Sequence, residues 1–429
     1  MKRLTVFLLV IVLFTNCINL SKENKQTIEN IETQFFEISI GEATTITTKG
    51  GVIIKIQENT FISDSKTIQL EVQEILTRAD LIRSQISTIT KDGKLLETGG
   101  MLNITTTSDA KINPDALITV KVPSKGLDID MKLFEAVNKD GKVVWSLKSD
   151  LENQALFDNI TSGKKLYIKE CSACHSKDLS KFSTGPVLGN ITAHRPKEWL
   201  RNFTRNAVRM IENRDSLALC NWANWEPTVM TSFEYLTDDE IDNIYSFIEN
   251  ETLLNGLDTM PDYLDCDSIP VFQVDTTNFT MSDFGYAIDT STTYIPQPFN
   301  PRTWYLYTIG DFNFTNIDRF IFTDTSKTIQ NVQPFEVTID KEPYIVFIIL
   351  KNRNTLVTCY LSKNDTWMII ESYPDKLIKL PKGEPVKIVA VSADYKKVAV
   401  LETTIQDENT YSLKLKPLET SYNDFIESL

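Results

Sequence analysis

Cys171-Ser172-Ala173-Cys174-His175 is the most informative stretch of this 429-residue chain. It sets two thiols three positions apart and an imidazole directly after the second thiol. This C-x-x-C-H spacing is the attachment sequence of c-type haem, in which each thiol adds to one vinyl group and the histidine coordinates iron. A zinc site would need a second close ligand pair, and the chain has only two histidines and no other such pair. A thioredoxin-like site would need a βαβ surround, which the flanking residues do not predict. We therefore expect one covalently attached haem c.

The segments on either side of this motif predict two helices that cross. Upstream, Gly163, Leu166 and Tyr167 stand at helical spacing, and a glycine inside a helix usually marks the close approach of another backbone. Downstream, residues 237–240 form a capping box ahead of an apolar stripe at positions 241, 244, 245 and 248. The second helix is the expected partner of Gly163.

In this order, the motif and its two helices resemble a class I cytochrome c over residues 154–252. The resemblance implies an all-α domain that carries single electrons and gives no indication of enzymatic activity. It implies that a carbonyl of the Gly185-Pro186 pair accepts a hydrogen bond from the second N–H of His175, a partner that metal-bound histidines usually have. It also implies that the aromatic side chain of Tyr167 supports the motif and that Trp199 packs near a haem propionate. The haem-binding residues expected on this basis are Cys171, Cys174, His175, Met230, Gly185, Pro186, Tyr167 and Trp199.

The expected sixth ligand is the sulfur of Met230, because a thioether favours ferrous iron and raises the reduction potential. Residues 230–240 match the run that precedes the closing helix of the family, except that Thr231 replaces a proline. Met210 falls within a predicted helix, and Met260 follows the closing helix. A labile or vacant sixth position remains open, and so does bis-histidine ligation by His194, whose polar surroundings favour an exposed loop.

The amino terminus predicts export. Residues 1–17 combine a basic start with an apolar run too short to span a membrane, which is typical of a signal peptide. The run ends at Cys17 and resembles a bacterial lipoprotein signal, although Asn16 is an unusual residue before the cysteine. We expect a lipid anchor at Cys17, a polar tether at 18–30 and a location in the bacterial cell envelope, facing the periplasm or the cell surface. Conventional cleavage to an unanchored protein remains the alternative.

Export places the six cysteines in an oxidising compartment. If Cys17 carries lipid and the motif carries haem, Cys220, Cys266 and Cys359 remain. An odd number leaves at least one free thiol. A Cys220–Cys266 bond would tie the cytochrome region to its exit linker, but the sequence leaves the pairing open.

The two flanking regions, 31–150 and 269–429, consist of short alternating strands separated by turn residues, which predicts antiparallel sandwiches. The expected fold class is multidomain: an all-β sandwich, then the all-α cytochrome c domain, then, after an acidic linker at 253–268, a second all-β sandwich. Residues 50–61 and 92–104 resemble a β module, distantly like that of netrin receptors and ankyrins, found in envelope lipoproteins. Residues 304–320 are similar to a segment of the same proteins. Neither β region contains a catalytic triad, a phosphate-binding loop or a metal-binding cluster.

The net charge of −14 is spread along the chain and disfavours nucleic acid as a partner. The expected partners are redox proteins of unknown identity and the membrane that holds the anchor. Lysines gather near the motif, where they form either a docking rim for an acidic partner or a solvated helix face: Lys164, Lys165, Lys169, Lys177 and Lys181.

Two classes of function remain open. The first is a membrane-tethered electron carrier with one His/Met-ligated haem. The second is a haem-containing protein that binds or senses a ligand at a labile sixth position, or a cytochrome subunit of a larger envelope redox complex.

Overall fold

The computed structural model of the protein describes residues 31–139, 142–225, 227–261, 266, 303–321, 335–339, 344–361, 367–368, 370–372, 376–377, 380–406 and 409–429. The chain divides into two compact units. The β unit takes in Met1–Val122, Asp130–Leu151 and Leu306–Leu429, and the helical unit takes in Pro123–Ile129 and Glu152–Tyr305. The predicted signal peptide and tether lie outside the described residues, as does most of 262–302.

Two main sheets form the first part of the β unit. One has the strand order β1 (Thr33–Ser39), β5 (Thr67–Ile75), β6 (Leu96–Thr106), β12 (Phe314–Phe320), β9 (Lys132–Lys139) and β10 (Lys142–Asp150). The other has the order β11 (Thr303–Ile309), β8 (Ile118–Ser124), β3 (Ile53–Ile56) and β2 (Thr44–Thr47). A small ladder joins β4 (Phe61–Ile62) to β7 (Lys111–Ile112).

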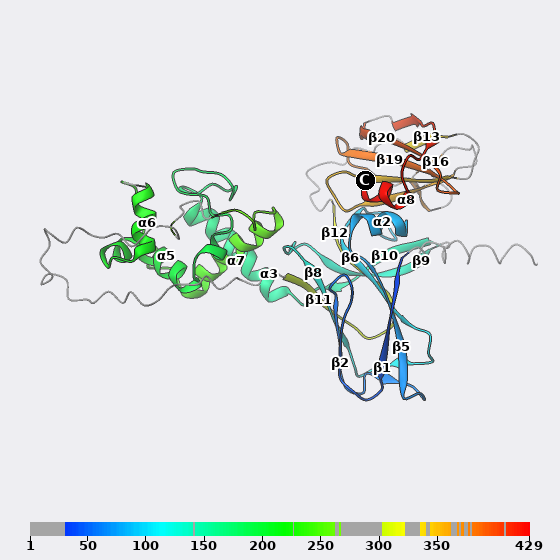
Figure 1. Cartoon of the computed structure of the whole chain (residues 1–429), viewed down its shortest axis with the longest axis horizontal. Helices are drawn as coiled ribbons and strands as arrows, with labels where there is room; N and C mark the ends of the chain where they lie inside the picture. The colour runs from blue at the N-terminus through cyan, green and yellow to red at the C-terminus, as the bar shows by residue number, and fades with distance from the viewer. Residues whose placement is uncertain are drawn as a thin grey trace, which may run out of the picture. The chain divides into compact units, whose positions relative to one another are not determined.

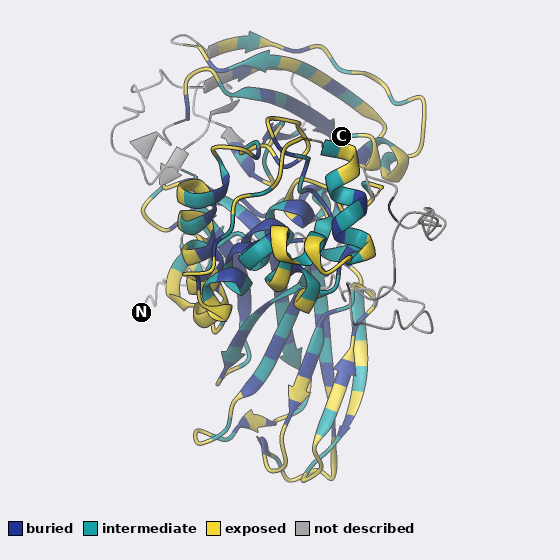
Figure 2. Ribbon diagram, turned by 90° about the vertical axis from the view of Figure 1, so that its left-hand side faces the viewer, coloured by how far each residue is buried: buried dark blue, intermediate teal, exposed yellow. Residues whose placement is uncertain are grey.

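Alternation along β5 shows why these residues form strands. Ile68, Leu70 and Val72 are all buried, while their neighbours are exposed or half-buried. Figure 2 shows the same alternation of buried and exposed residues along the long strands. Successive side chains of a strand point to opposite faces, so this pattern buries one face of the sheet. The strand predicted from the alternation at 68–72 is confirmed.

The C-terminal sheet has the order β21 (Asn409–Ser412), β13 (Phe335–Thr338), β16 (Trp367–Met368), β15 (Leu356–Leu361), β14 (Tyr344–Leu350), β19 (Pro385–Ser392), β20 (Lys397–Thr404) and β22 (Lys416–Pro417). A separate ladder pairs β17 (Ile370–Ser372) with β18 (Lys376–Leu377).

The two β regions share a hydrophobic core. Phe134 and Trp145, from the first region, belong to the same buried cluster as Phe347 and Val389 of the C-terminal sheet. Helix α2 (Arg78–Ser84) contributes to this cluster and lies between strands β6 and β10 and the C-terminal sheet (Figure 1), beside α8 (Tyr422–Glu427). The β regions therefore pack as one unit.

The helical unit contains α3 (Gln154–Leu166), the π-helical turn η1 (Tyr167–Cys171), α4 (Ile191–His194), α5 (Lys197–Glu212), α6 (Ser216–Trp225) and α7 (Asp238–Leu254). Long stretches without helix separate η1 from α4 and α6 from α7. Within the described ranges, no helix combines the length and apolar character required to cross a membrane.

The expected fold class, with an all-β sandwich, an all-α cytochrome c domain and a second all-β sandwich in succession, is wrong. The described chain is mostly β, and residues 160–252 do not form an all-α domain: their compact unit includes residues 123–129 and the first residues of β11. Strand β12 follows the helices in the sequence but pairs with β6 and β9, so the first sheet is completed only after the helices. Backbone pairing between strands about 200 residues apart leaves no local sequence pattern, and the predicted succession of domains is wrong for that reason.

Candidate functional site

Helices α3 and α7 form the frame of the site, and they touch at Gly163. A Cβ atom at this position would lie 1.8 Å from the backbone oxygen of Asn243. Only a glycine permits such an approach. At the start of α7, Thr237 and Glu240 form the predicted capping box, with each side chain bonded to the backbone of the other residue. The helix crossing predicted from the glycine and the capping box is therefore confirmed.

The C-x-x-C-H motif begins where α3 tightens into η1. The N–H groups of Cys174 and His175 both donate to the carbonyl of Cys171, at 3.1 and 2.9 Å, so the motif folds into one compact turn. Both thiols are free: that of Cys171 is buried and that of Cys174 is exposed. Burial, with smaller contributions from Glu170 and Cys174, raises the pKa of the Cys171 thiol to about 12.

Tyr167 supports this turn from outside the cavity described below. The residue is buried, and its hydroxyl donates to the carbonyl of Ser176 at 2.7 Å. Its ring lies against Phe247 of α7, with 5.4 Å between the ring centroids. Tyr167 thus links the motif to the closing helix and does not face the cavity.

His175 presents one nitrogen as an electron-pair donor. Its Nδ1 lies 2.9 Å from the carbonyl oxygen of Pro186, and a carbonyl only accepts, so Nδ1 carries the proton. The lone pair is then on Nε2, the atom available to a metal. Burial lowers the pKa of His175, and the bond to Pro186 opposes this effect. Gly185 packs flat on the ring, because a Cβ there would lie 2.8 Å from Cε1.

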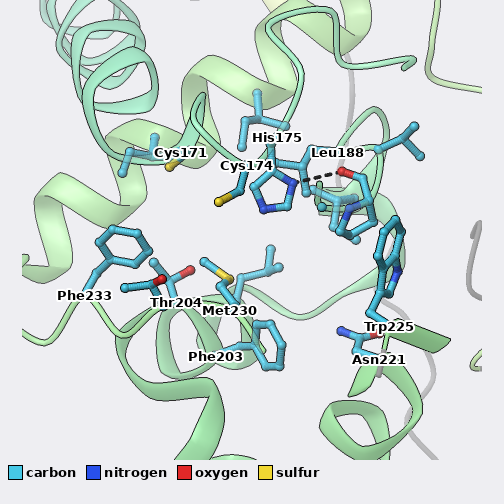
Figure 3. Close-up of a pocket in the computed structure, with 18 of the residues that line it drawn as sticks. Cys171, Cys174, His175, Leu188, Phe203, Thr204, Asn221, Trp225, Met230 and Phe233 are labelled. Carbon is cyan, nitrogen blue, oxygen red and sulfur yellow. Dashed lines mark hydrogen bonds between the residues drawn. The ribbon is translucent and has the colours of Figure 1, made fainter. Parts of the chain in front are cut away.

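A largely apolar cavity of about 320 Å³ lies beside the motif. Figure 3 shows the His175 ring and the Met230 side chain facing the same space from opposite walls, with both thiols at its edge. Seven of the expected haem-binding residues line this cavity: Cys171, Cys174, His175, Gly185, Pro186, Trp199 and Met230. Tyr167 lies behind the motif. Cys17, the predicted lipid anchor, lies outside the described residues.

The other two methionines lie elsewhere. Met210 is half-buried on α5 and is not part of the cavity wall. Met260 is not part of the cavity wall either, and its sulfur packs close to Gly189, 2.9 Å from the position of a Cβ at that residue. Among the three candidates, Met230 is the one whose side chain lines the cavity.

His194 differs from the expectation of an exposed loop. It ends the short helix α4, is half-buried and lines the cavity. Its Nε2 lies 3.0 Å from the carbonyl oxygen of Met260, which requires a proton on Nε2. That bond ties the imidazole to the backbone of Met260 and occupies Nε2.

Trp199 lines the cavity from the first turn of α5 and stacks on Phe203, with 4.6 Å between the ring centroids. Its indole N–H donates to Asp215 at 2.9 Å. The indole therefore anchors the end of α5 and offers the cavity a flat apolar face.

Helix α6 forms a wall that the sequence did not predict. Asn221, Trp222 and Trp225 line the cavity from this helix. The two tryptophans stand three residues apart, and this spacing could have indicated a helix with one apolar face. Cys220 of α6 is joined to Cys266 by a disulfide, the pairing that the sequence had left open. Cys359 is free and buried in the β unit.

Comparisons with known proteins find that part of this chain is similar to cytochrome c. Residues 160–252 match the family model described as Cytochrome c. A cytochrome c from Rhodothermus marinus is 24% identical over 25% of this chain and 84% of that chain, with a TM-score of 0.21. No curated protein matches the chain. The family match implies a c-type haem as the cofactor of this region and haem-based electron transfer as its class of activity.

The donor set around the cavity fits such a haem. Two free thiols border it, one imidazole has its Nε2 lone pair available, and one thioether faces that imidazole across apolar walls. No cluster of three or more His, Cys, Asp or Glu side chains suited to a metal ion occurs in the part of the chain that the structure describes.

Proposed function

We propose that this protein is a membrane-tethered c-type cytochrome that carries single electrons through one covalently attached, His/Met-ligated haem. The proposal rests above all on one observation: His175, with its Nδ1 proton bound to Pro186, shares a cavity with Met230 and with the free thiols of Cys171 and Cys174. When bound, the haem supplies a one-electron iron couple.

The residues around the cavity have separate roles in this proposal. Cys171 and Cys174 would hold the haem covalently, with each S–H adding across one of its two vinyl groups. The carbonyl of Pro186 fixes the tautomer of His175 and makes Nε2 a stronger donor. The Met230 sulfur favours the ferrous state, and the apolar walls exclude water; both effects raise the reduction potential.

Covalent attachment is tested by producing the full chain in a host with the attachment machinery and separating it on a denaturing gel. The wild-type polypeptide should retain haem, and Cys171→Ser with Cys174→Ser should lose it. Cys359→Ala, which removes a free thiol in the other unit, is the matched control and should retain haem. Loss of haem from the denatured wild-type chain would refute covalent attachment.

Axial ligation is tested by Met230→Ala, with Met210→Ala and Met260→Ala as controls. Met230→Ala should abolish the far-red absorption band of sulfur-ligated ferric haem, lower the reduction potential and admit imidazole to the iron. Both control variants should keep the wild-type spectrum. A silent Met230→Ala together with an altered His194→Ala would replace this assignment with bis-histidine ligation.

A second candidate function is the binding or sensing of a small ligand at a labile sixth position. It is favoured by the segment 228–233, which lies in neither helix nor strand and has Thr231 where a proline would stiffen the chain. A ferric spectrum without the sulfur band in the wild-type protein would favour this function over electron transfer.

The location and the partners belong to the same proposal. We expect Cys17 to be acylated and to tether the protein to a bacterial envelope membrane, where another redox protein exchanges electrons with it. Mass spectrometry of the mature N-terminus tests the anchor. Cleavage elsewhere, leaving an unmodified terminus, would contradict it.

A further inference from the structure

Helix α5 breaks at Asn206, whose backbone angles of φ −156° and ψ 85° are not helical. In a regular helix, the carbonyl of Arg205 would accept from the N–H of Arg209. Here the side-chain Oδ1 of Asn206 accepts that N–H at 2.9 Å, as the N-cap of a new helix does. The carbonyls of Thr204 and Arg205 instead accept from the N–H of Phe233, at 3.2 and 3.0 Å. The break therefore exchanges a bond within the helix for a bond to another segment.

Two side-chain contacts strengthen this attachment. The Nδ2 of Asn206 donates to Glu234 at 2.5 Å. Arg205 forms an ion pair with Asp238, the first residue of α7. Phe233 itself is buried and lines the cavity. The chain from 233 to 238 is thus held against the broken turn of α5 at three points: Phe233, Glu234 and Asp238.

The attached segment is the one that carries Met230. Residues 228–233 lie in neither helix nor strand. Without an attachment, this segment would lose conformational entropy when the Met230 sulfur bound iron. The bonds at Phe233 fix the chain three residues beyond the methionine. Figure 3 shows Thr204 and Phe233 on the same side of the cavity as Met230.

We propose that Asn206 is a positioning residue for the Met230 sulfur. Its side chain stabilises the break in α5, and the break frees two carbonyls that hold Phe233 and so keep the methionine segment against the haem. This inference rests on the proposed role of Met230 as sixth ligand. In this role, Asn206 restricts the conformational freedom of the methionine segment, which has Thr231 in place of a stiffening proline.

The test is Asn206→Ala in the full-length, haem-loaded protein. Alanine removes the acceptor for the N–H of Arg209 and favours an unbroken helix, which takes back the carbonyls used by Phe233. The affinity of ferric haem for imidazole should rise about tenfold, equivalent to about 1.4 kcal/mol. Hydrogen exchange at the Phe233 amide should quicken by a similar factor, about tenfold.

Two variants separate positioning from general loss of structure. Asn206→Ser keeps an oxygen acceptor for the helix N-cap but loses the Nδ2 that bonds to Glu234, so it should bring imidazole affinity to within about twofold of the wild-type value. Asn255→Ala removes an asparagine whose Nδ2 donates to a carbonyl at the end of α7, 2.7 Å away, and should change neither readout. If Asn206→Ala does not fold, Glu234→Ala removes one exposed contact and should raise imidazole affinity about twofold.

The outcomes are distinguishable. The inference is overturned if Met230→Ala opens the iron to imidazole while Asn206→Ala leaves imidazole affinity at the wild-type value. It is also overturned if Asn206→Ser behaves like Asn206→Ala. A Met230→Ala variant with an unchanged spectrum would instead refute the ligation on which the inference rests. In that case, faster exchange of the Phe233 amide in Asn206→Ala would show that Asn206 holds the segment in the wild-type protein for a reason other than ligation.

Discussion

Gly163→Ala should separate the two helices that frame the cavity. The added Cβ would lie 1.8 Å from the oxygen and 2.4 Å from the carbon of the Asn243 carbonyl, and 3.0 Å from the nitrogen of Ile244. These are backbone atoms of α7, so no side chain can rotate away. The helices would have to move apart by more than about 1 Å to reach van der Waals distance.

The magnitude follows from two opposing effects. Overpacking a tight contact costs about 1–3 kcal/mol and more where the backbone must shift, so the upper end applies here. Alanine gains about 1 kcal/mol over glycine in helix propensity. We expect the helical unit to lose a net ~2 kcal/mol or more of unfolding free energy.

The assay is equilibrium denaturation of the haem-loaded full chain, followed by haem absorbance so that only the helical unit is observed. Ser162→Ala, one residue earlier and exposed, is the control and should change stability by no more than about 0.5 kcal/mol. A Gly163→Ala protein as stable as the wild type, or more stable, would refute the close approach of the two helices.

Three further predictions concern the same unit. Gly185→Ala should push the His175 ring off its backbone acceptor, since the new Cβ would lie 2.8 Å from Cε1, and should raise the reduction potential by on the order of 60 mV in voltammetry. Cys220→Ser should cost about 3–4 kcal/mol in denaturant titration, because the disulfide to Cys266 closes a loop with a sequence separation of 46; an unchanged midpoint would mean the bond does not form. Burial raises the pKa of Glu249 to about 7, so its folded form holds a proton more tightly than the unfolded form and its contribution to stability falls as pH rises from about 5 to about 8. Glu249→Gln should therefore gain stability over the wild type across that range, and a pH-independent difference would contradict the shift.

Several features of this site could be predicted because their causes are local. The capping box at Thr237 depends on residues within one helical turn, and the motif at 171–175 folds through bonds between its own atoms. The strand at β5 follows from alternation along nine residues. Gly163 identified a helix contact because the absence of a side chain has few other uses inside a helix.

The break in α5 could not be predicted in the same way. The sequence around Asn206 is compatible with a continuous helix, and the break depends on an N–H from Phe233, 27 positions away in the chain. The half-buried position of His194 likewise depends on the carbonyl of Met260. Each case requires an acceptor or donor that becomes a neighbour only after the chain has folded.

The sequence by itself determined that residues 154–252 carry a C-x-x-C-H motif between two helices that meet, because residue spacing along the chain sets the motif, the helix cap and the glycine contact. The tertiary structure alone decided that β11 and β12 return to complete sheets begun before the helices, and that Cys220 pairs with Cys266. Strand pairing and disulfide formation join groups through space. Their partners are chosen by burial and by backbone hydrogen bonding across the whole fold, and neither leaves a periodic mark in the residues between them.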